Sequence, residues 1–412
     1  MLHRPAQSDK QPHSAAAVGN WRSWLLAAVA ATTPTAPTFA LRAGAVVCLL
    51  VLVTRLLAWR VSASDVLAIM MATLATLSTT WALNEDVTAL SAKNQLAVVA
   101  IFLSVRAVAR TQRDLGIISA GYLLGCVYGM YLIFKENGST HFVPELADAR
   151  YGITGLNFNY LAYSLITGLV IVVFLWQWRK ARSVLLLVAA FLLLGVQLSG
   201  SRGALIAGGA LGLWLILIRL YPRARASGLR WIYTLVVLTI VAIPAGWMDF
   251  VLVTVDNRLA RSTGDLAGRL TVWPIARDVF WQHPFTGVGA GGFLAVDPSG
   301  IGAHNVVLEV GTGMGILGLS LFAGILFTTL ITGTRSLSPN RRPLLLGSLI
   351  VAWLPIYLSG HWELSPAAWV VLGIFSRVGY LSDAATFDED AASKSGAKNA
   401  YSDPRKSRSL IP

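Results

Sequence analysis

Apolar segments long enough to cross a lipid bilayer recur along almost the whole chain, and this repetition restricts the fold more than any other feature. A membrane-spanning helix needs about 20 mostly apolar residues. We predict spans at residues 24–40, 43–58, 66–83, 94–109, 115–134, 157–178, 183–199, 204–218, 231–248, 304–333, 344–359 and 366–381. Because backbone polar groups in a bilayer must be satisfied internally, these segments predict an all-α polytopic membrane protein with about twelve transmembrane helices.

The composition excludes other classes of protein. Hydrophobic residues make up 55% of the chain and charged residues 13%, and the mean hydropathy is +0.63. Soluble domains have about 25% charged residues, so a soluble globular enzyme, a disordered chain and a disulfide-stapled secreted domain are all excluded. The two cysteines, Cys48 and Cys126, lie in apolar segments and indicate neither a disulfide framework nor a metal site.

The basic residues predict the topology, because Lys and Arg collect on the cytoplasmic side of membrane proteins. The formal net charge is +13, and with the N-terminus inside, the inside segments hold 21 of the 33 basic residues and the outside segments 9. We expect residues 1–23 to form a cytoplasmic N-terminal segment without a removable signal peptide, 24–381 the membrane domain, and 382–412 a disordered cytoplasmic tail.

Residues 249–303 form the largest predicted soluble segment, a periplasmic or extracellular loop, and function often resides on such loops. Residues 269–282 within it are predicted to be a helix that ends at His283-Pro284. The helical spacing is that of Val272, Ile275, Ala276, Val279 and Phe280. Taken alone, this segment is a packing helix at the membrane interface.

His304-Asn305 stands where this loop returns to the membrane, ahead of a run of glycines. Histidine exchanges a proton near neutral pH, although a lone histidine at the end of a span is more often a structural hydrogen-bonding group. Gly311 and Gly315 form a small-xxx-small pair that lets two helices approach closely. Residues 313–318 match the G-x-G-x-x-G fingerprint, but they lie inside a predicted span without a preceding strand, so we expect no nucleotide site.

Ser201-Arg202-Gly203 forms a predicted tight turn on the outer face. An arginine at membrane depth is costly, so Arg202 either extends to the interface or binds an anion. Its guanidinium matches phosphate geometry through two parallel hydrogen bonds. Together with Arg269 and Arg150, it would give one outer cavity the positive charge to hold a lipid-linked pyrophosphate.

These residues together resemble the O-antigen ligase/polymerase superfamily of membrane glycosyltransferases. The ligase motif is His; Asn, Ser or Gln; nine residues; Gly; two residues; and Gly, Thr or Tyr, and it is complete here from His304 to Gly318. Ser201-Arg202-Gly203 resembles the family's S-R-G motif, and residues 150–159 resemble its R-x-x-G…N motif, with Phe158 in place of the usual proline. The G-R…W…F…P…G-x-G…F signature is matched by Gly268-Arg269, Trp273, Phe280, His283-Pro284, Gly287, Gly289 and Phe293.

The resemblance implies an inverting, metal-independent glycosyl transfer on the outer face of the bacterial inner membrane, with no cofactor, nucleotide or nucleic acid. The implied donor is a glycan on undecaprenyl pyrophosphate. The implied acceptor is a lipid A–core sugar or another envelope acceptor for a ligase, and another lipid-linked repeat unit for an O-antigen, capsule or exopolysaccharide polymerase.

The resemblance also implies roles for particular residues. His304, Arg202 and Arg269 correspond to the family's essential histidine and arginines, and we expect them to be catalytic. The arginines would bind the pyrophosphate leaving group, and the histidine would take the proton of the acceptor hydroxyl. The residues expected to bind substrate are Arg150, Asn159, Ser201 and Asn305.

A transporter or flippase of lipid-linked glycans is the alternative from another class. It would also have about twelve spans and buried arginines, but transporters often contain internal repeats and broken helices near the midplane. The sequence shows no such repeat, and its candidate charged residues cluster at the outer face. His361, in His361-Trp362-Glu363 on the predicted outer face, lies outside every motif, so we expect that His361→Ala costs little activity.

Overall fold

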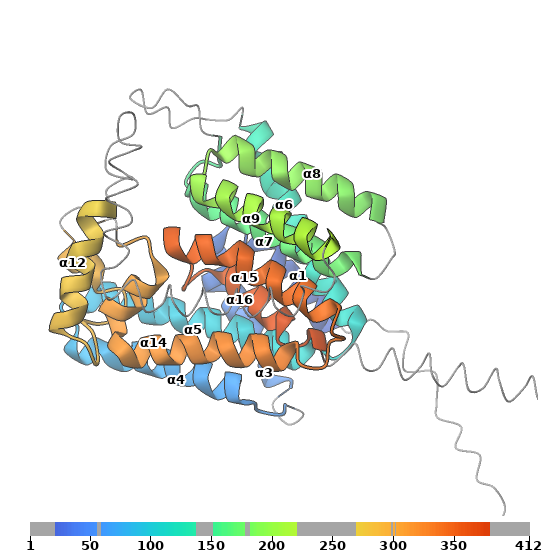
Figure 1. Cartoon of the computed structure of the whole chain (residues 1–412). Helices are drawn as coiled ribbons and strands as arrows, with labels where there is room; N and C mark the ends of the chain where they lie inside the picture. The colour runs from blue at the N-terminus through green and yellow to red at the C-terminus, as the bar shows by residue number, and fades with distance from the viewer. Residues whose placement is uncertain are drawn as a thin grey trace, which may run out of the picture.

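The computed structural model of the chain describes residues 21–55, 59–136, 151–177, 182–220, 269–297, 300 and 302–379. Every regular element in these ranges is a helix (Figure 1). Eight of the described helices are long and apolar enough to cross a membrane. The prediction of an all-α, multi-pass membrane protein is therefore confirmed, but the number of twelve spans is not. The predicted span 231–248, the tail 382–412 and much of the loop 249–303 lie outside the described residues.

The eight long helices coincide with predicted apolar segments, although α5 begins at Glu85, before the predicted span 94–109. They are α4 (Ala63–Leu77) with its 3-10 extension η4 (Ser78–Trp81), α5 (Glu85–Val108), α6 (Gln112–Lys135), α7 (Phe158–Trp176), α8 (Arg182–Ser199), α9 (Arg202–Leu220), α14 (Val306–Gly333) and α15 (Arg341–Ser359).

The first predicted span, 24–40, is wrong as a single helix. α1 (Trp21–Thr32) has 12 residues and ends in a turn. The chain then forms one composite helix of α2 (Pro37–Phe39), the π-helix η2 (Ala40–Gly44) and α3 (Ala45–Val53). The physical reason is proline: Pro34 and Pro37 lack the N–H that a helix interior needs, whereas Pro37 fits the first turn of a new helix.

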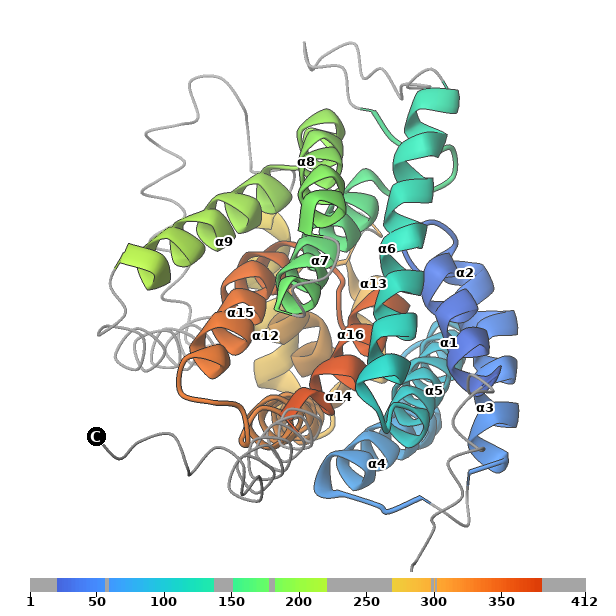
Figure 2. The same ribbon diagram turned by 90° about the vertical axis from the view of Figure 1, so that its right-hand side faces the viewer.

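α16 (Pro366–Phe375) has 10 residues, shorter than the predicted span 366–381, and all ten are buried. It lies in the centre of the bundle, packed against α5, α7 and α14 (Figure 2). Around it, α1 packs along α6, α7 along α8, α9 along α15, and α4 along α14. Because α16 is central, the loop that joins α15 to α16 enters the bundle, where Trp362 is 1% exposed.

α14 is kinked at Gly315, whose φ of 62° and ψ of −160° are not helical. The kink exposes backbone groups that the 284–288 segment satisfies: Ile316 N donates to Pro284 O at 2.7 Å, and Val288 N donates to Thr312 O at 2.9 Å. A Cβ at position 315 would overlap the Phe285 backbone. The second glycine of the predicted small-xxx-small pair thus receives a loop rather than another helix.

α12 (Arg269–Gln282) has the predicted bounds and ends directly before His283-Pro284. Its buried side chains form a second apolar cluster with the short α13 (Phe293–Val296) and the start of α14. The members of this cluster are Val272, Trp273, Ala276, Val279, Val288, Phe293, Ala303 and Leu308. α12 therefore covers the end of the bundle at which α14 begins (Figure 1).

Candidate functional site

The turn that leads to His304 is fixed on several sides. Trp273 Nε1 of α12 donates to Ala303 O at 2.8 Å, and Ala303 N donates to Glu309 Oε1 at 2.6 Å. On the other side of His304, Asn305 Oδ1 caps α14 by accepting from Val307 N at 3.0 Å. The backbone on both sides of His304 is therefore held by α12 and by the first turn of α14.

His304 has a φ of 50°, and it is the only non-glycine residue with a positive φ in the described ranges. This conformation costs a side-chain-bearing residue roughly 1–3 kcal/mol and persists only where the surroundings impose it. The hydrogen bonds to Ala303 and the cap at Asn305 supply that constraint. The turn thus presents a partly exposed histidine in a strained conformation, a pattern typical of functional sites.

His361 lies directly against His304, although it belongs to none of the motifs. The centroids of the two imidazole rings are 4.3 Å apart and the ring planes are tilted by 55°. His361 Nδ1 is 3.0 Å from Glu309 Oε1, the same oxygen that accepts from Ala303 N. The family motifs do not include His361, so they could not predict this contact. The sequence feature that could have indicated it is the His361-Trp362-Glu363 turn, which lies between two apolar spans on the same predicted face as His304.

A second carboxyl group lies in the same turn. Glu363 is 9% exposed, and its Oε2 has no hydrogen-bonding partner among the described residues. Burial is the main cause that raises the pKa of Glu363 from 4.5 to about 7; the charge of His361 opposes the rise, and the charge of Glu309 contributes to it. No three metal-ligating side chains in the described ranges are placed to share an ion.

The Ser201-Arg202-Gly203 turn lies at the same end of the bundle. Arg202 is the exposed first residue of α9, and the buried hydroxyl of Ser201 is 3.5 Å from Ala204 N at the start of that helix. A Cβ on Gly203 would lie 2.8 Å from Tyr163 Oη and would overlap Ser359 Oγ. Since Ser359 ends α15 two residues before His361, the S-R-G turn packs beside the segment that carries His361.

The other predicted site residues are placed less completely. Arg269 is the first residue of α12, the helix that holds Ala303. Arg150 lies outside the described residues, but the next residue, Tyr151, donates its N–H to Leu198 O at 3.0 Å, just before the S-R-G turn. Asn159 is the second residue of α7, and its N–H donates to Asn157 Oδ1 at 2.8 Å.

Residues 187–323 match the O-antigen ligase family. Over this range, about a third of its length, the chain is similar to the O-antigen ligases. The resemblance of its motifs to that superfamily is thereby confirmed, and the matched range contains Arg202, Arg269 and His304. The match ends within α14, so α15, α16 and His361 lie beyond it. No curated protein matches the chain.

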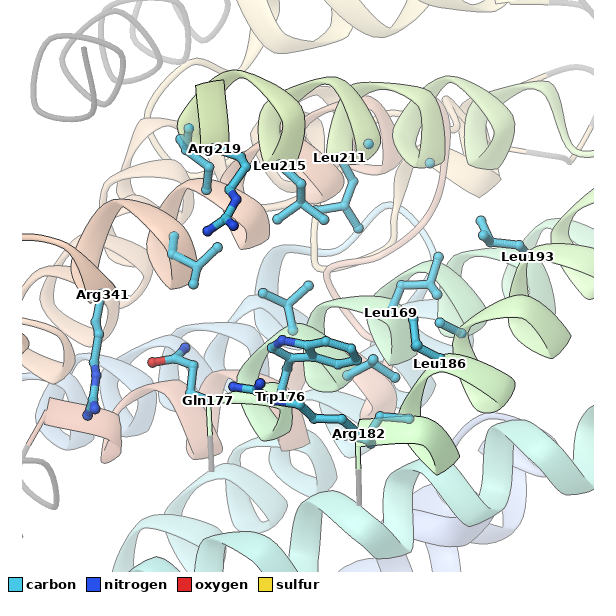
Figure 3. A pocket seen from close by; sticks show the side chains of 18 of the residues that line it. Leu169, Trp176, Gln177, Arg182, Leu186, Leu193, Leu211, Leu215, Arg219 and Arg341 are labelled. Carbon is cyan, nitrogen blue, oxygen red and sulfur yellow. The ribbon is translucent and has the colours of Figure 1, made fainter. Parts of the chain in front are cut away.

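A cavity of about 820 Å³ lies between α7, α8, α9 and α15 (Figure 3). Its walls are mostly apolar, and its charged residues are Arg182, Arg219 and Arg341, all from segments predicted to be cytoplasmic. Arg341 begins α15 and Ser359 ends it, so these points are about 27 Å apart at 1.5 Å per residue. These arginines therefore lie at the end of α15 opposite to His361 and are not part of the His304 site.

Proposed function

We propose that this O-antigen ligase-type membrane protein transfers a glycan from undecaprenyl pyrophosphate to an acceptor hydroxyl, on the outer face of the bacterial inner membrane. The supporting observation is the contact chain that joins the two motif turns: Gly203 packs on Ser359, and His361, two residues later, contacts His304. Arg202, as the proposed anion-binding residue, and His304, as the proposed proton acceptor, both lie in the range that matches the family, and this contact chain links their turns.

The proposed reaction is a single displacement without a metal ion. The acceptor oxygen attacks the anomeric carbon from the face opposite the pyrophosphate, so the bond to the pyrophosphate oxygen breaks and the configuration inverts. His304 takes the proton of the acceptor hydroxyl. Arg202 and Arg269 bind the pyrophosphate and stabilise the negative charge that the leaving group gains.

The proposed substrate-binding residues divide into two groups. Arg150 and Asn159 lie on either side, in sequence, of the segment that begins with Tyr151, whose N–H donates to Leu198 O near the end of α8. They would contact the donor. Ser201 and Asn305 cap α9 and α14, so they would act mainly by shaping the turns that carry Arg202 and His304. Asn305 Nδ2 is buried without a hydrogen-bonding partner in the described residues, so both of its N–H groups would be available to a substrate oxygen that reaches it.

The proposed topology places both termini in the cytoplasm and the loop 249–303 outside. It rests on the 21 inside basic residues among 33 and on the grouping of three predicted inside arginines around one cavity. Labelling of a single cysteine at Ser262 by an impermeant reagent in intact cells tests it. Labelling of a probe at Ser395 instead would show that the topology is inverted.

The test of the function is transfer by the purified protein from an undecaprenyl-pyrophosphate-linked glycan. Product on lipid A–core supports a ligase, whereas growth of the lipid-linked glycan itself supports a repeat-unit polymerase. A transporter would move the lipid-linked glycan across a vesicle membrane without forming either product, and that result would contradict the proposal.

A further inference from the structure

We propose that His361 is a positioning residue for glycosyl transfer, and that Glu309 and His361 together hold His304 in the orientation in which it takes the acceptor's proton. This inference rests on the proposed function, and it deepens that function by assigning roles to two residues outside the arginine–histidine set. One of them, His361, lies outside the range that matches the family.

A single carboxylate oxygen connects the two histidines. Glu309 Oε1 accepts from Ala303 N at 2.6 Å and lies 3.0 Å from His361 Nδ1. Ala303 directly precedes His304, so Glu309 fixes the backbone on one side of His304 and the ring that contacts it. Glu309 itself is only 7% exposed, in the first turn of α14, and its position is therefore set by a packed helix.

Gly302 leaves the space that this pairing needs. Its φ is 78°, and a Cβ there would lie 2.6 Å from His361 Cε1 and 2.7 Å from Glu309 Oε1. Its N–H donates to Asp297 Oδ2 at 3.0 Å, which anchors the turn to the end of α13. A side chain at this position would separate the imidazole from the carboxylate, so the turn is shaped around their contact.

The hydrogen bond also determines which nitrogen of His361 carries a proton. A carboxylate only accepts hydrogen bonds, so Nδ1 carries the proton and Nε2 is the unprotonated nitrogen of the neutral ring. A carboxylate that holds the imidazole in this way fixes both its tautomer and its orientation, as in other His–carboxylate pairs. His361 can then support His304 through ring contact without replacing it as the base.

The charges around the pair favour a proton on His304 during the reaction. Among the described residues, Glu309 from α14 contacts His361, and the charge of Glu363 in the α15–α16 loop also acts on His361. Asp297 lies one step further away, as the acceptor of the Gly302 N–H. When His304 takes the acceptor proton it becomes positive beside His361. The negative charge of Glu309 offsets that positive charge across a low-dielectric end of the bundle.

The test compares H361A, H361N and E309Q with the wild-type protein in steady-state transfer across pH. We expect H361A to lower kcat by roughly 10- to 100-fold, less than the 10²–10⁴-fold typical of losing the base itself, with KM for the lipid-linked donor within about twofold. H361N keeps an N–H near the Nδ1 position and should recover much of that loss. In E309Q the acidic limb of the kcat profile should move to lower pH, because the histidine pair loses the negative charge that favours protonation.

The control variant is D278N, which removes an exposed carboxylate of α12 that pairs with Arg277 and should leave kcat and the pH profile unchanged. Wild-type kcat in H361A, or an unshifted acidic limb in E309Q, would overturn the inference even if H304A is inactive. A wild-type protein that transfers no glycan would overturn the proposed function and the inference with it. If H361A does not fold, the near-isosteric H361N and E309Q decide the question through the pH profile.

Discussion

The ring centroid of His361 lies 4.3 Å from that of His304. In the sequence, however, His304 precedes α14 and His361 follows α15, so two long helices separate them. The contact is possible because α14 and α15 run in opposite directions and bring the start of one beside the end of the other. Substitutions at the two histidines should therefore not act independently.

H304A should retain donor binding but lose transfer by ~10²–10⁴-fold, or roughly 3–5 kcal/mol of transition-state stabilisation. The variant should fold, because His304 is partly exposed and the hydrogen bonds from Trp273 Nε1 to Ala303 O and from Val307 N to Asn305 Oδ1 do not involve its side chain. Transfer at saturating donor, measured together with donor binding, checks this. Wild-type transfer by H304A would remove the base from the mechanism.

The double variant H304A/H361A should transfer no more slowly than H304A alone, because a positioning residue acts only through the group it positions. A further loss of tenfold or more in the double variant would mean that His361 contacts the reaction directly. The wild-type protein, the two single variants and the double variant form a double-mutant cycle, measured in the same transfer assay. The ratio of their rates gives the coupling between the two histidines.

Arg202→Lys and Arg269→Lys should each lower transfer by about 10²-fold or more, because an ammonium group cannot reproduce the two parallel hydrogen bonds of a guanidinium on a phosphate. Arg277→Lys is the matched control, since Arg277 lies on the same helix as Arg269 and pairs with Asp278 at the surface. Full activity of Arg269→Lys, at equal protein levels, would exclude this residue from pyrophosphate binding.

The helices were predictable because their signal is local, and the bounds of α12 follow directly from the spacing of Val272, Ala276 and Val279. The candidate base His304 was predictable because it belongs to a contiguous motif. The contact with His361 was not, because it depends on the antiparallel packing of two long helices. The kink at Gly315 also escaped prediction: its cause is the insertion of residues 284–288, which the apolar pattern of α14 does not reveal.

Gly302→Ala should lower transfer by about tenfold or more, whereas Gly300→Ala should not. Both glycines have a positive φ, so each substitution strains the backbone, but a Cβ at position 300 meets nothing within 4 Å, and one at 302 meets His361 and Glu309. A displacement of His361 and Glu309 by about 1 Å would misplace His304, and a misplacement of that size is enough to lower the rate of a reaction strongly. Steady-state transfer and thermal stability of both variants check this. Equal activity of the two would show that the space at Gly302 is not needed for catalysis.

Ionisation of Glu363 should lower the stability of the folded protein as the pH rises. Its folded-state pKa of about 7 lies above the ordinary 4.5, so the folded protein binds this proton more tightly than the unfolded chain. The stability that this gives is complete below pH 4.5 and is lost as the pH rises towards 7. The shift corresponds to a loss of about 3 kcal/mol. E363Q, which cannot ionise, should therefore gain stability relative to the wild-type protein between pH 5 and pH 8. Thermal unfolding of both proteins in detergent across that range measures the difference, and a difference that stays constant with pH would show that the Glu363 carboxyl titrates normally.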